Sequence, residues 1–230
     1  GPAAFIDFIH KIQLNLTKAD ISFTAPLSYD AEIPGGDIEV RDMFNLYKYE
    51  NMLYVMKLSG KEIKDFLEES YYMWTNQMKS PEDHLLWLKE KRTAGAEDRA
   101  SFQNFSFNFD SAAGIIYTVD VTKPKGEKVT IVSMADGAPF RMDHIYKVAL
   151  NSYRGNGGGE LLTKGSGIPQ EKLKERIIFS TDKDLRFYLM QYIEKKGTLN
   201  PRALNQWKFI PEEWVKPAAE RDYEYLFGTK

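Results

Sequence analysis

Two segments of the chain carry apolar residues at the spacing of an amphipathic helix. Residues 3–16 repeat them every three or four positions, and His10 falls on the more polar side, where we expect a surface residue. Residues 60–75 follow the same pattern behind Ser59, which forms a capping box with Glu62. The charged residues of this second helix are expected to form a solvated face: Lys61, Glu62, Asp65, Glu68 and Glu69.

The other elements are predicted from alternation and from turn residues. Extended patterns are found at residues 20–25, 52–58, 115–121, 129–132 and 146–150. Thr181 is expected to cap a third helix that stops at Gly197, and a short helix is expected near Trp214. We expect residues 76–104 to be an excursion with a short helix or hairpin, and the apolar end of the chain to pack back on the domain. Without internal repeats or linkers, residues 1–230 are expected to form one domain.

The strand predicted at 146–150 leads into a glycine-rich loop, residues 151–159, of sequence Asn-Ser-Tyr-Arg-Gly-Asn-Gly-Gly-Gly. Glycines allow positive φ and close backbone approach, and an aromatic ring, an amide and a guanidinium suit a flat ligand with polar edges, such as a nucleobase. On the loop alone, a plain strand-to-helix connection with Tyr153 in the core is the simpler interpretation. The spacing matches neither a P-loop nor the dinucleotide fingerprint.

Composition narrows the classes of function. The 230 residues, 43% of them hydrophobic, suffice for a sizeable core, and a net charge of −2 argues against nucleic-acid polymers and anionic membranes. There are no cysteines, and the three histidines form no His-x-His or Asp-x-His pair, which argues against thiolate and two-metal sites. A Gly-x-Ser-x-Gly elbow is also missing. The chain therefore suits binding better than catalysis. Its Gly-Pro start is typical of tag removal, so we expect a piece of a longer protein.

Several stretches, in order, resemble the C-terminal domain of the 5′-nucleotidase family. They are residues 19–22, 42–51, 58–68 and 151–159. Ala25-Pro26 and the Asn-Phe-Asp at 108–110 are most similar to the 2′,3′-cyclic-nucleotide 2′-phosphodiesterase/3′-nucleotidase branch. The likeness covers most of residues 4–196. It implies an α+β fold in which mixed sheets are flanked by helices, layered α/β/β/α, acting as a substrate-recognition domain.

The resemblance also implies a division of labour. An N-terminal metallophosphoesterase domain of the same polypeptide would carry two divalent metal ions and perform hydrolysis, while the present chain would bind the base and ribose without a cofactor of its own. Family members of this kind are exported, so a periplasmic or cell-surface location is expected. The partner would be a nucleoside or nucleotide. A non-catalytic module that docks a protein or a glycan is the alternative, and a self-contained enzyme is a third possibility.

The resemblance also implies which residues bind the ligand. Phe109 and Tyr153 match the two aromatics that sandwich the base, Asn151 would brace the loop, and Arg154 would offer donors to ribose or phosphate. The remaining matched positions are Asp110, Gly157 and Gly158. The 5′-nucleotidases proper carry an arginine-containing segment after the first strand, where this chain has Ala-Pro-Leu-Ser. That difference argues against a plain 5′-monophosphate substrate.

Overall fold

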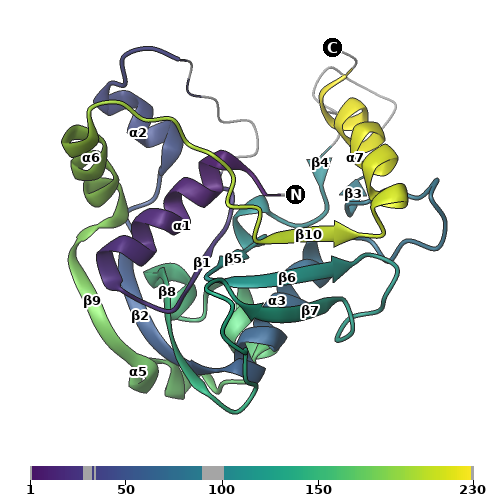
Figure 1. Ribbon diagram of the computed structural model, residues 1–230, viewed down its shortest axis with the longest axis horizontal. Helices are drawn as coiled ribbons and strands as arrows, with labels where there is room; N and C mark the ends of the chain where they lie inside the picture. Colours follow the sequence, from purple (N-terminus) through teal and green to yellow (C-terminus); the bar gives the residue numbers. More distant parts are fainter. Residues whose placement is uncertain (1, 28–32, 34, 90–100, 229–230) are drawn as a thin grey trace.

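The computed structural model describes residues 2–27, 33, 35–89 and 101–228 (Figure 1). The helices are α1 (Ala4–Thr17), α2 (Val40–Leu46), α3 (Gly60–Trp74), α4 (Ser152–Gly155), α5 (Leu173–Arg176), α6 (Leu185–Lys196) and α7 (Glu212–Phe227). The strands are β1 (Ile21–Thr24), β2 (Met52–Ser59), β3 (Leu88–Lys89), β4 (Ser101–Phe102), β5 (Ser111–Ala113), β6 (Ile115–Asp120), β7 (Val129–Met134), β8 (Ile145–Asn151), β9 (Ile177–Asp184) and β10 (Trp207–Ile210). The structure is a mixed α+β fold with sheets flanked by helices, which confirms the predicted fold class.

The largest sheet has five strands in the order β5-β1-β8-β2-β9. β8 runs parallel to β1 and antiparallel to β2. In that second pairing Leu53 lies opposite Asn151, so the start of β2 and the end of β8 meet at one edge of the sheet. A three-stranded sheet, β10-β6-β7, and the short β3-β4 pair complete the strands. The edge where β2 begins and β8 ends is where the glycine-rich loop emerges.

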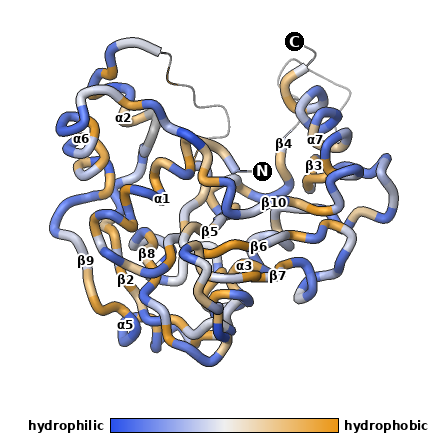
Figure 2. Tube along the Cα trace, in the orientation of Figure 1, coloured by the Kyte–Doolittle hydropathy of each residue, from blue (hydrophilic) through white to orange (hydrophobic). Residues whose placement is uncertain are grey.

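Helices pack on both faces of the five-stranded sheet. One apolar cluster joins α1, α2 and α6 to Leu53 and Ala149 of the sheet. The other joins α3 to residues of both larger sheets, with Phe66 stacked on Phe23 at 4.1 Å between ring centroids. Figure 2 shows the apolar segments concentrated on the inner strands, such as β2 and β6. α3 therefore ties the two sheets together.

The sequence pattern predicted most of the elements, but the predicted cap of one helix is wrong. The capping box of α3 is confirmed: the Ser59 Oγ accepts from the Glu62 amide at 3.2 Å, and the Glu62 carboxylate accepts from the Ser59 amide at 2.7 Å. α6, however, is capped by Asp184 and not by Thr181. Thr181 lies in β9, a strand the sequence analysis did not predict, and its hydroxyl accepts from the Leu53 amide. Thr181 is therefore extended because β9 pairs with β2.

The C-terminal segment is longer and better packed than the predicted short helix. α7 has 16 residues, and Trp214 packs against the core while Asp222 accepts from the Leu86 amide at 2.8 Å. The hydroxyl of Tyr225 donates to the carbonyl of Lys89 at 3.2 Å. The expectation that this end packs back on the domain is confirmed. The β3-β4 pair agrees with the hairpin expected within residues 76–104, although residues 90–100 lie outside the described ranges.

The predicted solvated face of α3 is wrong for two of its residues. Glu68 and Glu69 are 3% and 1% exposed. The turn between β6 and β7 folds over them, so that Glu68 accepts hydrogen bonds from backbone amides of that turn and Glu69 pairs with Lys125. Buried carboxylates need such partners, because an unpaired buried charge is strongly unfavourable.

His10, predicted to lie at the surface, is fully buried. Its Nδ1 lies 2.9 Å from the Ser22 Oγ, and its Nε2 lies 3.2 Å from the Ser111 Oγ. Because the Ser22 hydroxyl donates to the Gln13 Oε1, it accepts from Nδ1–H, which leaves Nε2 as an acceptor for Ser111. Two strands, β1 and β5, thus cover the side of α1 that the sequence pattern assigned to solvent.

Burial lowers the pKa of His10 to about 3 from 6.5. Between these values the unfolded chain binds a proton that the folded chain excludes, so this histidine is expected to lower the free energy of unfolding by about 1.4 kcal/mol per pH unit as the pH falls below 6.5. Urea unfolding of the wild type and of His10→Gln at several pH values measures this slope. A slope that His10→Gln leaves unchanged would contradict the assignment.

Candidate functional site

A pocket of about 160 Å³ lies where β8 ends and β2 begins. It is lined by Leu27, Tyr49, Asn51, Phe107, Asn151 and Tyr153. Two of these residues, Asn151 and Tyr153, belong to the glycine-rich loop predicted as a ligand site. Tyr153 is 42% exposed, so it is not the core aromatic of the simpler interpretation. The pocket combines aromatic walls with two carboxamides, as sites for flat polar ligands do.

Two features of the loop position Tyr153: the N-cap of α4, and a glycine whose backbone packs against the ring. The Asn151 Oδ1 caps α4 by accepting from the Arg154 amide at 2.8 Å. Gly157 then turns the chain with a φ of 94°, a conformation that disfavours other residues. At Gly158 a Cβ would stand 2.5 Å from the Tyr153 ring. The ring therefore lies flat against a position where only glycine fits.

Arg154 is buried and does not face the pocket, contrary to the expectation that it offers donors to ribose or phosphate. It is 1% exposed, and its guanidinium pairs with the Asp110 carboxylate at 2.5 Å. It also donates to the Phe107 carbonyl at 3.0 Å and to the Gly158 carbonyl. The guanidinium thus joins the segment around residue 107 to the glycine loop. Its role in this structure is to hold the two walls of the pocket.

Asp110, also predicted to touch the ligand, is 1% exposed, does not line the pocket and pairs with Arg154. Burial raises the pKa of its carboxyl, and the adjacent guanidinium opposes that rise. The main-chain oxygen of Asp110 accepts from the Ser70 hydroxyl at 2.8 Å, which ties this segment to α3. Asp110 therefore supports the site through its buried contacts with Arg154 and α3.

Phe109 does not contribute a wall of this pocket, and the predicted pairing of Phe109 with Tyr153 has to be corrected. Its side chain is 2% exposed and stacks on Trp74, with 5.4 Å between centroids and 3° between planes. The ring that lies against Tyr153 is Phe107, at 6.2 Å and 85°. Which of the two phenylalanines faces Tyr153 depends on the single turn of 3₁₀ helix at Ser106–Asn108. A sequence pattern does not reveal this turn.

A buried tyrosine supports both carboxamides of the pocket. Asn51 donates to the Tyr47 hydroxyl at 3.5 Å, and hydrogen bonds from Asn51 and Asn151 oppose the rise that burial causes in the pKa of Tyr47, which reaches about 12. The hydroxyl therefore stays protonated near neutral pH. Amides held in this way present fixed polar groups to a ligand.

The sequence analysis did not single out four of the lining residues: Leu27, Tyr49, Asn51 and Phe107. The antiparallel pairing of β2 with β8 brings Tyr49 and Asn51 to the loop, because the residues before β2 meet the residues after β8. The position of Tyr49 and Asn51 next to a predicted strand could have marked them as candidates for the site. The sequence did not show that this strand pairs with β8, because the pairing joins segments far apart in the chain.

The described residues contain no group of three or more His, Asp or Glu side chains placed to hold a metal ion. Across the same ranges, no helix combines the length and the apolar character that a membrane span requires.

A comparison against known families identifies the family of the chain. Residues 1–164 match the family model described as "5'-nucleotidase, C-terminal domain". Because this match covers more than half of the 230 residues, the chain belongs to that family. The predicted family is thereby confirmed.

Two relatives of known activity are similar to most of the chain. The chain is 31% identical over 196 residues to the trifunctional nucleotide phosphoesterase protein YfkN of Bacillus subtilis, which covers 80% of the chain and 12% of that protein. It is 28% identical over 201 residues to the 2′,3′-cyclic-nucleotide 2′-phosphodiesterase/3′-nucleotidase of Haemophilus influenzae, covering 81% of the chain and 27% of the relative. The chain thus spans about an eighth of the length of YfkN and about a quarter of the length of the second relative.

A solved structure shares the fold. The putative 5′-nucleotidase from Staphylococcus aureus, crystallised with α-ketoglutarate, aligns with a TM-score of 0.67 and 21% sequence identity. The alignment covers 90% of this chain and 36% of that protein. At this identity the likeness concerns the fold alone.

Proposed function

We propose that this chain is the nucleoside-recognition domain of a metal-dependent nucleotide phosphoesterase, in which the base binds between Phe107 and Tyr153. The observation that carries the proposal is the pocket itself, in which two aromatic rings and two braced carboxamides converge at the glycine loop. The relatives named above are nucleotide phosphoesterases, which supports the ligand class. Arg154 supports the clamp by bonding to the backbone on both of its sides.

The two rings are placed for a clamp that closes on its ligand. They now meet edge to face at 6.2 Å. Phe105 stacks on Phe107 with 5.0 Å between ring centroids and 8° between planes, and the Tyr153 side chain is 42% exposed. A planar base needs two roughly parallel faces, so the angle between the two rings changes when the ligand enters. Base stacking of this kind contributes about 1–3 kcal/mol per ring.

The hydrolytic step belongs, in this proposal, to an N-terminal metallophosphoesterase domain of the same polypeptide that carries two divalent metal ions. The short span of the chain relative to YfkN and the Haemophilus influenzae protein supports this division. The preferred phosphate, whether 2′,3′-cyclic or 3′, would then be set by the two domains together. An exported protein, periplasmic or at the cell surface, is part of the same proposal.

Tyr153→Ala and Phe107→Ala are each expected to weaken adenosine and 3′-AMP binding by about 5- to 150-fold, because each removes one stacking face. Titration calorimetry with the purified chain measures this. The melting temperature of Tyr153→Ala should change little, since the ring is half exposed. Adenosine affinity should be the same with and without a chelator, because the lining residues contain no metal-binding group.

Two control variants make this test specific. Tyr72→Ala removes a ring that is 43% exposed on α3, outside the pocket, and should leave adenosine affinity unchanged. Phe109→Ala should instead lower stability by about 3 kcal/mol or more, as deletion of a buried aromatic does. If neither Tyr153→Ala nor Phe107→Ala alters affinity, the clamp is wrong, and docking of a protein or glycan becomes the better proposal.

A further inference from the structure

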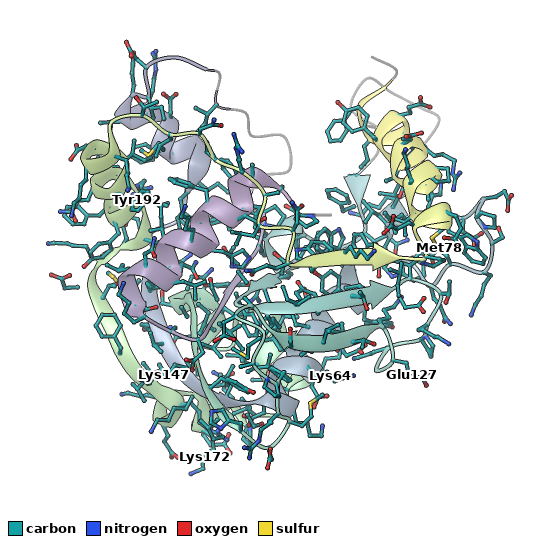
Figure 3. The ribbon with its side chains drawn as sticks, viewed as in Figure 1. Lys64, Met78, Glu127, Lys147, Lys172 and Tyr192 are labelled. Carbon is teal, nitrogen blue, oxygen red and sulfur yellow. The ribbon has the colours of Figure 1, made fainter. Side chains whose placement is uncertain are left out.

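A second, larger pocket lies on another part of the molecule. It has a volume of about 420 Å³ and is formed by α1, α6 and residues 198–204, which lead from α6 toward β10. Figure 3 labels Tyr192, one of its lining residues, on α6. This pocket shares no lining residue with the pocket at the glycine loop. It is thus a separate cavity, and its size falls within the range of small-molecule sites.

The pocket has an aromatic wall and a segment held in place over it. Phe8 and Tyr192 meet edge to face with 5.7 Å between centroids. Asp7, 4% exposed, accepts from the Leu204 amide at 2.7 Å and so ties residues 198–204 to α1. This hydrogen bond fixes one wall of the cavity, whereas Lys11, Lys196 and Arg202 line it with exposed side chains.

The charge of the lining is strongly one-sided. It contains Lys11, Lys196 and Arg202, while Asp7 is the one acidic residue among the described lining residues. None of the three cations takes part in the ion pairs found within the described ranges. The chain as a whole carries a net charge of −2. A local excess of unpaired positive charge around a cavity attracts small anions.

We propose that this pocket is a binding site for a small, multiply charged anion, such as one with a polyphosphate group or several carboxylates. The two lysines and the arginine would hold the charged groups, with the guanidinium offering a planar fork of donors. A flat organic part of the ligand would lie against Tyr192, over which the Lys196 Nζ stands 5.9 Å from the ring centroid. This site does not depend on the function proposed for the first pocket.

The test is calorimetric titration of the chain with pyrophosphate and, separately, with citrate, at low ionic strength. The wild type is expected to bind at least one of them, and Lys11→Gln/Lys196→Gln is expected to weaken that binding at least about tenfold, because two charged donors are lost. Arg202→Gln should weaken it as well. Affinity should fall as salt is added.

Controls separate this site from general attraction and from the first pocket. Lys147→Gln removes an exposed lysine of β8, which Figure 3 shows well away from Tyr192, and should leave binding unchanged. Tyr153→Ala should also leave it unchanged. The proposal fails if neither anion binds, if the double variant binds as the wild type does, or if Lys147→Gln or Tyr153→Ala has the larger effect.

Discussion

Arg154→Ala is expected to lower the free energy of unfolding by about 3–5 kcal/mol, the usual loss when one partner of a buried ion pair is removed. The Asp110 carboxylate, 1% exposed, would be left in the interior without its cation. The carbonyls of Phe107 and Gly158 would lose their donor in the same step. Urea unfolding followed by circular dichroism measures the change.

Two further variants test whether the ion pair is the cause. Arg154→Lys keeps the charge but not the planar fork that reaches four groups at once, so it should remain clearly destabilised. Arg154→Met combined with Asp110→Leu removes both charges and should be more stable than Arg154→Ala. Because Arg154 joins both walls, adenosine affinity should fall in the single variant too. A stability loss below about 1 kcal/mol would show that the pair is dispensable.

Glu68→Ala is expected to lower the free energy of unfolding by about 3 kcal/mol or more, although Glu68 does not line the pocket at the glycine loop. The Glu68 carboxylate accepts from three backbone amides, those of Val129 at 2.7 Å, Gly126 at 2.8 Å and Lys128 at 3.2 Å. Each buried donor left without a partner costs about 1–3 kcal/mol. Lys128 and Val129 are 1% and 2% exposed, so water does not replace the carboxylate there. Urea unfolding gives the magnitude, and hydrogen exchange at these amides should accelerate.

The neighbouring glutamate provides the control. Glu127 is exposed on the same turn, where Figure 3 labels it, and Glu127→Ala should change stability by less than about 0.5 kcal/mol. Glu68→Gln retains one acceptor oxygen, so its stability should lie between those of Glu68→Ala and Glu127→Ala. Equal stabilities of Glu68→Ala and Glu127→Ala would mean that the turn is held by other contacts.

Elements governed by neighbours in the sequence were predictable. The capping box at Ser59 requires residues three apart, and the alternation of residues 115–121 requires a period of two. In each case the interacting groups lie within a few residues, so local pattern and local energetics coincide. The family, too, was recognisable from ordered motifs.

Properties that depend on distant segments were not predictable. His10, Glu68 and Glu69 carry the pattern of surface residues, yet strands or turns 12 to 101 positions away cover them. Whether Phe107 or Phe109 enters the pocket follows from one 3₁₀ turn and from the stacking of Phe109 on Trp74. The parallel pairing of β10 with β6 likewise joins segments nearly 90 residues apart.

The amino-acid sequence was sufficient to predict α1, α3, the strands β1, β2, β6, β7 and β8, the glycine loop and the family of this chain, because these rest on short-range periodicity and on ordered motifs. The packed fold alone decided that Arg154 supports the site from within and that Phe107 faces Tyr153, since burial and side-chain direction arise only when β2, β8 and α3 come together. Short-range preferences act through a few neighbouring residues, whereas exclusion of water and pairing of charges are properties of the assembled interior.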